Sequence, residues 1–173
     1  MDQKAPRQHT AYISLGSNMG NRLQACRDAI TALAADGGGT ICGRSRFYQT
    51  SPVGDTDQDW YLNCAVALTT PLQPAELLAL CLNIEKRAGR VRTQRRYGPR
   101  VLDLDIVIFG TRVIKSPELT IPHPRMHERR FVLQPICDIN PQLQHPLLNK
   151  SIGELLETLQ DPSQQIKVYP CDY

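Results

Sequence analysis

The sequence predicts an α+β fold with a ferredoxin-like β-α-β-β-α-β core. In such a core a mostly antiparallel sheet carries its helices on one face, and here further elements follow as C-terminal additions. Two observations predict this class. Stretches of strand-like apolar residues are interleaved with stretches whose apolar residues recur at helical spacing, and their order matches the ferredoxin-like plan. The length of 173 residues suits one domain. We therefore expect a single domain over residues 1–173, with a polar N-terminal extension over residues 1–9.

Glycine and proline delimit the elements of this core. A strand over residues 11–16 is followed by a helix from about residue 20 to residue 36, which a run of three glycines ends. Two strands over residues 40–49 and 60–69 come next. The second helix has Pro74 in its first turn and stops at Gly89. The remaining elements are expected in the order of a fourth core strand over 101–109, a short strand near 112–114, a helix around 129–137, a helix whose capping box is Ser151 and Glu154, and an edge strand over 166–169.

Composition and charge restrict the class of protein. The net charge of +3 lacks the strongly basic character of a general nucleic-acid binder. No stretch reaches the ~18 apolar residues of a membrane span, and the first ten residues lack the apolar core of a secretion signal. The six cysteines form no C-x-x-C pair, which indicates reduced thiols rather than a disulfide framework or a zinc site. We therefore expect a cytoplasmic protein that binds neither nucleic acid nor membrane.

The fourth core strand contains two aspartates, Asp103 and Asp105, within an aliphatic run. Because alternate side chains point to opposite faces, the even positions 102 to 108 face the helices and both carboxylates lie on the other face, ~6.7 Å apart along the strand. At an effective dielectric of ~20 their repulsion is about 2.5 kcal/mol, which a cation would relieve. Carboxylate oxygens suit Mg²⁺, and two metal ions ~3.5 to 4 Å apart fit this spacing. The alternative is a pair of solvated charges that protects the sheet from edge pairing.

Two neighbouring features favour the metal site. On the third core strand Tyr61, Asn63, Ala65 and Ala67 share the face with the two acids, and we expect this face to be exposed as the floor of a ligand site. The stretch 85–100 holds seven basic residues, and guanidinium groups bind phosphate oxygens while staying charged. This stretch is also long for a loop, as lids are. A mobile solvated loop or a nucleic-acid contact is the alternative reading of its charge.

Other common site motifs are missing. The glycines at 16, 20 and 37–39 fit neither the P-loop nor the dinucleotide-binding pattern. The aspartates of residues 55–59 lack the glycine and glutamate of a calcium loop, and the prolines beside His123 and His127 argue against a zinc-binding helix.

Five segments, taken in order, resemble the 6-hydroxymethyl-7,8-dihydropterin pyrophosphokinase family of folate biosynthesis. They are SLGSNMGNR, FYQTSPVG, DQDWYLNCAVAL, GRVRTQRRYGPRVLDLDIVIFG and LTIPHPRMHERRFVLQP, and together they cover about residues 10–140. The family has a ferredoxin-like α+β fold and transfers the pyrophosphoryl unit of ATP to the pterin hydroxymethyl group, releasing AMP. The resemblance therefore implies ATP as co-substrate, two Mg²⁺ ions and the pterin as acceptor. We also expect a monomer.

The resemblance also implies roles for individual residues. Asp103 and Asp105 would bind the metal ions, and Arg90 and Arg92 would act with them as catalytic residues by closing over the phosphates. The further ATP contacts implied are Glu85, Tyr97, Arg100, Ile106, Thr120, His123 and Arg129. The pterin contacts implied are Thr50, Ser51, Val53, Tyr61, Asn63 and Phe131. Departures from the bacterial pattern occur at Ser51, Tyr97, Glu118 and Pro124, and they concern the lid and the finer ATP contacts rather than the acid pair.

Two other functions remain open at this point. A ferredoxin-like RNA-binding module would use the basic stretch, but such modules present stacking aromatics on their central strands, where this chain has acids. A two-metal nucleotidyltransferase would use the acid pair equally well. Its product would be pyrophosphate, whereas a pyrophosphokinase releases AMP.

Overall fold

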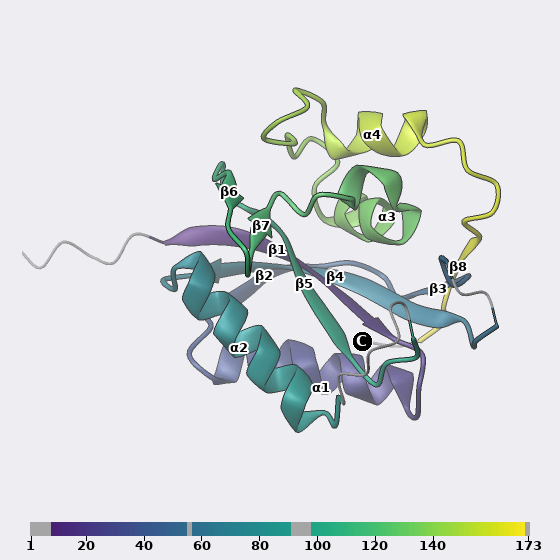
Figure 1. Cartoon of the computed structure of the whole chain (residues 1–173), viewed down its shortest axis with the longest axis horizontal. Helices are drawn as coiled ribbons and strands as arrows, with labels where there is room; N and C mark the ends of the chain where they lie inside the picture. Colours follow the sequence, from purple (N-terminus) through teal and green to yellow (C-terminus); the bar gives the residue numbers. More distant parts are fainter. Residues whose placement is uncertain (1–7, 55–56, 91–97, 172–173) are drawn as a thin grey trace, which may run out of the picture.

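The structure is a computed structural model that describes residues 8–54, 57–90 and 98–171. Its central element is a six-stranded sheet in the order β5-β1-β4-β3-β8, with β2 also paired to β4 (Figure 1). Neighbouring strands in this sheet are antiparallel. The strands are β1 (His9–Ser17), β2 (Thr40–Arg44), β3 (Tyr48–Thr50), β4 (Tyr61–Thr70), β5 (Asp103–Phe109) and β8 (Ile166–Val168). The predicted mixture of helices with an antiparallel sheet is confirmed.

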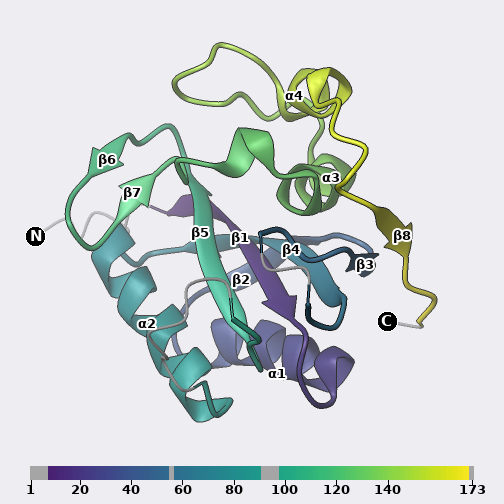
Figure 2. The same ribbon diagram turned by 45° about the vertical axis from the view of Figure 1, so that its right-hand side comes forward.

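Helices cover both faces of the sheet (Figures 1 and 2). The core helices α1 (Arg22–Ala35) and α2 (Pro74–Arg87) pack on one face. On the other face lies α3 (Arg130–Ile139), and α4 (Ile152–Thr158) packs on α3. The connection from β5 to α3 contains a hairpin of β6 (Ile114–Lys115) and β7 (Thr120–Ile121) and the 3-10 helix η1 (Met126–Glu128). No helix of the described residues is long and apolar enough to cross a membrane.

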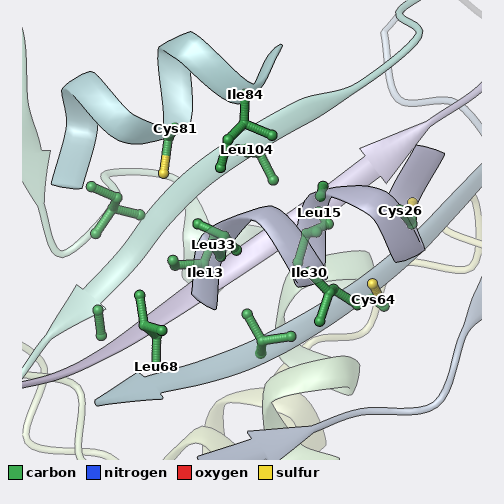
Figure 3. Close-up of a cluster of buried hydrophobic side chains, with 14 of the residues drawn as sticks. Ile13, Leu15, Cys26, Ile30, Leu33, Cys64, Leu68, Cys81, Ile84 and Leu104 are labelled. Carbon is green, nitrogen blue, oxygen red and sulfur yellow. The ribbon is translucent and has the colours of Figure 1, made fainter. Parts of the chain in front are cut away.

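The main hydrophobic core lies between the sheet and the two core helices (Figure 3). Alternate residues of β1, such as Ile13 and Leu15, point into it, as Cys64 does from β4. From the helices come Ile30, Leu33, Cys81 and Ile84. Each Leu or Ile buried in this way contributes ~1.5 to 3 kcal/mol relative to an exposed side chain. The helical spacing read from the sequence is thus the spacing of the residues that fill this core.

The second face of the sheet is not the open floor that the sequence suggested. Ala65 and Ala67 are only 1% and 2% exposed because the apolar side of α3 packs on them. The far end of α3 is tied to the sheet by Asp138, which accepts hydrogen bonds from the Tyr48 hydroxyl at 2.8 Å and from Arg46 Nη2 at 2.8 Å. The small alanine side chains let the helix approach closely. Among the residues that the structure describes, the end of this face near Tyr61 and Asn63 lines a pocket.

A β-bulge in β5 changes the face of the sheet to which the last side chains of this strand point. Ile13 pairs with Ile106 and Tyr12 with Ile108, so Val107 is the extra residue. Its insertion sends both Val107 and Ile108 to the α3 side, and Phe109 returns to the main core. The prediction that Ile108 faces the core helices is therefore wrong. Leu104 and Ile106, which precede the bulge, face the core helices as predicted.

The remaining elements follow the sequence with two adjustments. The strand expected over 40–49 is divided into β2 and β3. At Ser45 the side-chain hydroxyl accepts the hydrogen bond from Ala65 N–H at 2.8 Å, while Ser45 N–H still donates to the Ala65 carbonyl at 3.0 Å. Residues 1–7 of the predicted extension lie outside the described residues, and His9 already belongs to β1. The capping box of α4 is present, and β8 is confirmed as a strand that pairs with β3.

Candidate functional site

One pocket lies where β1, β4 and β5 meet the start of α3. It contains about 660 Å³ of empty space, part of which is open to solvent. Its lining is formed by Ser14, Gly16, Thr50, Ser51, Val53, Tyr61, Asn63, Arg100, Asp103, Asp105, Arg129 and Phe131. All six residues expected to contact the pterin and both expected metal ligands are therefore in one place.

Strand register explains why these side chains meet. Gly16 of β1 stands between Asp103 of β5 and Asn63 of β4 in one row across the sheet. A Cβ atom on Gly16 would lie 2.7 Å from Asn63 Oδ1, so glycine keeps the space between the acid and the amide open. In the next row Ser14 pairs with Asp105. The acid pair and the amide are thus fixed to rigid strands rather than to loops.

Asp103 is held by two arginines. Arg90 Nη1 donates to its Oδ1 at 2.6 Å, and Arg100 Nη1 contacts its Oδ2. The carboxylate is 20% exposed at the pocket wall, so these pairs are only partly screened by water. Arg90 was expected to close over phosphates and instead lies against the acids. Its role toward a phosphate remains a prediction.

Asp105 lies in a different environment. Its carboxylate makes no hydrogen bond or ion pair with any residue in the described part of the chain, although the side chain lines the pocket. Burial and the neighbouring Asp103 charge raise its pKa to about 6, against the opposing effect of Arg129 and Arg100. An acid with this raised pKa, beside a second acid, favours a divalent cation. Groups of three or more metal-ligating side chains are absent from the described residues, so a cation here would take its other ligands from phosphates and water.

Glu85 contacts both the strand that carries the acid pair and Arg90. It comes from the last turn of α2, is 3% exposed, and accepts a hydrogen bond from Leu104 N–H at 2.8 Å. Arg90 Nη1 also contacts this carboxylate. Burial raises the pKa of Glu85, while the bond to Leu104 and the charge of Arg90 counteract the rise. Glu85 was expected at the ATP site. It does not line the pocket, and in the structure it orients Arg90 and the strand between the two aspartates.

The expected pterin side of the pocket combines rings with one amide. Asn63 is 4% exposed and donates from Nδ2 to Thr50 Oγ1 at 2.7 Å, which leaves Oδ1 on the side of Gly16. The Tyr61 hydroxyl donates to Gln58 Oε1 at 3.1 Å. On the opposite wall the Arg129 guanidinium carbon lies over the Phe131 ring, 5.5 Å from the ring centroid. Two aromatic rings and an oriented acceptor are suited to a flat heterocycle.

The expected ATP contacts are only partly brought together. Arg100 and Arg129 line the pocket, whereas Ile106, Thr120 and His123 do not. The Ile106 side chain is buried in the main core, so only its backbone could meet a ligand. Arg92 and Tyr97 lie outside the described residues.

His123 is held by the strand bulge. Its N–H donates to the carbonyl of Val107 at 2.8 Å, and its Nδ1 accepts from Arg125 N–H at 3.2 Å. Burial and the charge of Arg129 lower the pKa of His123 to about 4. The imidazole is therefore neutral at pH 7 and carries its proton on Nε2, where it can donate a hydrogen bond to an acceptor such as a phosphate oxygen.

Sequence reasoning gave no role to Asn18. Its Oδ1 accepts from Arg100 N–H at 2.7 Å, and its Nδ2 donates to Gln58 Oε1 at 3.0 Å and to the Asp59 carbonyl at 3.2 Å. It therefore ties the end of β1 to the segments that precede β4 and β5. An asparagine directly after a buried strand is the signal that could have identified it.

The raised pKa of Asp105 would make the binding of a divalent cation at this position depend on pH. We expect Mg²⁺ to raise the thermal midpoint at about pH 7.5 and to have little effect at about pH 5, because below pH 6 the cation must displace a proton from Asp105. Without metal the sign is opposite: the contribution of Asp105 to the free energy of unfolding is fully present below about pH 4 and is lost as pH rises through about 6. Thermal unfolding with and without MgCl₂ at both pH values measures this. An equal shift at both pH values would contradict the assignment.

Fold and site together define a class of protein: an α+β protein in which one pocket joins two strand-borne carboxylates and two arginines to two aromatic rings. The chain belongs to the 7,8-dihydro-6-hydroxymethylpterin-pyrophosphokinase (HPPK) family, whose sequence model matches residues 12–141. A relative from Methylorubrum extorquens is named 2-amino-4-hydroxy-6-hydroxymethyldihydropteridine pyrophosphokinase. It is 44% identical over 153 residues, which is 88% of this chain and 94% of the relative. A relative of the same name from Bacillus subtilis is 46% identical over 134 residues, 78% of this chain and 80% of the relative.

Solved structures agree on the fold. Wild-type Plasmodium falciparum HPPK-DHPS, crystallised with pteroate, superposes with a TM-score of 0.70 at 16% identity over 87% of this chain. The match covers 42% of that longer protein.

Proposed function

We propose that this chain transfers the β,γ-pyrophosphoryl group of ATP to the hydroxymethyl oxygen of 6-hydroxymethyl-7,8-dihydropterin, giving AMP and the pterin diphosphate, in folate biosynthesis. Family membership and the names of the curated relatives support this reaction. The observation that carries the proposal is that one pocket contains two strand-borne carboxylates, two arginines, and two aromatic rings beside an oriented amide.

In this proposal the protein supplies alignment and charge rather than covalent chemistry. Transfer of a phosphoryl group is accelerated mainly by positioning and by stabilising charge on the phosphate oxygens. Arg100 and Arg129 would hold those oxygens at the pocket wall. Arg90 would join them by releasing the Asp103 carboxylate and donating its hydrogen bond to a phosphate oxygen instead. Asp103 and Asp105 would hold two Mg²⁺ ions, which when bound would supply positive charge to the phosphates and lower the pKa of the attacking hydroxyl.

The acceptor would lie between Tyr61 and Phe131. Asn63 Oδ1 would accept a hydrogen bond from the pterin edge, because its Nδ2 is already used by Thr50. Ser51 and Val53 would border the same edge. The hydroxymethyl group would then point along the row from Asn63 past Gly16 to Asp103, toward the phosphates.

Further properties belong to the same proposal. The core would be ferredoxin-like, which the strand order β5-β1-β4-β2 and the two helices on one face support. The chain would be a single domain over residues 1–173 and a monomer. A cytoplasmic location is supported by six free thiols, all within the described ranges.

The nucleotide product tests the reaction. The protein is incubated with ATP, Mg²⁺ and 6-hydroxymethyl-7,8-dihydropterin, and the nucleotides are separated. We expect AMP to form in step with consumption of the pterin. Formation of ADP, or release of free pyrophosphate as from a nucleotidyltransferase, would reject the proposal.

A further inference from the structure

Three residues near the C-terminal end join the two walls of the pocket. Ser163, Gln164 and Gln165, named here the clasp, lie between α4 and β8. The family match ends at residue 141, so the clasp is built from residues outside it. Asp161 orders the turn before it by accepting from Ser163 N–H at 3.0 Å and from Gln164 Nε2 at 3.0 Å.

On one side the clasp holds the start of α3. Gln164 Oε1 accepts from Arg130 N–H at 2.7 Å, and its Nε2 donates to the Glu128 carbonyl at 2.8 Å. These two bonds bracket Arg129, which is the N-cap residue of α3 and makes no side-chain cap hydrogen bond. The first N–H groups of a helix have no partner within the helix. Gln164 thus supplies, from 34 residues away, the acceptor that a capping side chain would normally provide.

On the other side the clasp holds the loop after β3. Ser51 N–H donates to the Gln165 carbonyl at 3.0 Å, and the Ser51 hydroxyl donates to the Ser163 carbonyl at 3.0 Å. Gln165 N–H in turn donates to Ser51 Oγ at 3.0 Å. A serine at this position uses both its amide and its hydroxyl in these bonds. A proline, which has neither group, could not make them.

Both attachment points belong to the substrate pocket. Ser51 lines one wall, and Arg129 and Phe131, on either side of Arg130, line the other. We infer that Gln164 is a positioning residue that fixes the spacing between these walls, and thereby the gap into which the pterin ring fits. This inference rests on the proposed function. The effect should be larger for the pterin than for ATP, because the clasp bonds to both segments that flank the ring site. Of the proposed phosphate contacts only Arg129 lies at an attachment point, whereas Arg100 and Asp103 are held by other contacts.

Gln164→Ala tests the inference. We expect the KM for the pterin to rise about fivefold, which corresponds to ~1 kcal/mol, the net value of about one hydrogen bond. The KM for ATP should stay within about twofold. Gln160→Ala is the matched control, because Gln160 is an exposed glutamine of the same segment whose side chain makes no hydrogen bond with the described residues. Equilibrium binding of the pterin, followed by its fluorescence, should weaken by the same factor as the KM rises.

A merely structural role gives a different result. It would lower kcat and the thermal midpoint together and leave both KM values unchanged, and this outcome would overturn the inference. Gln164→Glu keeps an oxygen for Arg130 N–H but loses the donor to Glu128. Gln164→Glu is the alternative test variant if Gln164→Ala does not fold. We expect it to raise the KM for the pterin by at least about twofold. Absence of AMP formation by the unaltered protein would reject the proposed function. An active protein whose pterin KM is insensitive to both Gln164 variants would reject the positioning role alone.

Discussion

Asp105→Asn is expected to lower kcat by at least about 10³-fold, which corresponds to ~4 kcal/mol of transition-state stabilisation. Asparagine has nearly the same shape, so the β5 pairing with Ser14 should persist. What is lost is the negative charge that would hold a divalent cation over the phosphates. Asp103 cannot replace it, because Asp103 is itself a proposed ligand of the same pair of ions and also contacts Arg90 and Arg100. Initial rates of AMP formation over a range of Mg²⁺ concentrations measure the effect.

The control for this variant is Asp28→Asn, which changes an exposed acid on α1. Pterin binding without ATP should be nearly unchanged in Asp105→Asn, because Tyr61, Asn63 and Phe131 are intact. Full activity of Asp105→Asn at ordinary Mg²⁺ concentrations would contradict the proposal that this residue binds a metal ion. Loss of pterin binding together with turnover would point to a disturbed pocket instead.

Glu85→Ala is expected to lower the free energy of unfolding by about 3 kcal/mol, because it removes one member of a largely buried charged network. The buried Leu104 N–H loses its acceptor, and Arg90 loses one of its two carboxylate partners. An orphaned buried donor alone costs ~1 to 3 kcal/mol. Turnover should also fall, because Arg90 is no longer oriented and the strand between Asp103 and Asp105 is less firmly held. Urea unfolding and AMP formation measure the two effects.

Glu85→Gln separates these contributions. Its amide oxygen can still accept from Leu104 N–H, so we expect it to recover most of the stability while activity stays reduced by the lost charge. Glu157→Ala, at an exposed position on α4, is the matched control. If Glu85→Ala unfolds at the same urea concentration as the unaltered protein, the network does not contribute to stability as proposed here.

Most elements of the fold could be predicted because their signals are local. The periodic apolar residues of α1 and α2, the proline at the start of α2 and the capping box of α4 each reflect contacts within a few residues. The covering of Ala65 and Ala67 by α3 could not be predicted in this way. Small apolar residues on an expected open face are compatible with solvent or with a closely packed helix, and only the tertiary fold decides. The bulge at Val107 was missed for the same reason.

The candidate site was predicted largely through its motifs. Strand alternation placed Asp103 and Asp105 on one face, and the structure brings them to the pocket that also holds Tyr61 and Asn63. The different environments of the two acids could not be read from alternation, because they depend on Arg90, Arg100 and burial beneath distant elements. The clasp was equally hidden. Its contacts join residues 34 to 114 positions apart, and glutamine and serine in a polar tail give no local signal.

The pairing of β8 with β3 has a consequence for how the molecule folds. Strand β3 pairs with β8, which lies more than 100 residues later in the chain. Because this contact closes one of the longest loops in the chain, it is expected to form late during folding. Until it does, one side of β3 has unsatisfied backbone donors and acceptors beside an otherwise assembled sheet. Aggregation during refolding should therefore start at β3, and hydrogen exchange in a refolding time course should show its amides gaining protection after those of β1 and β4.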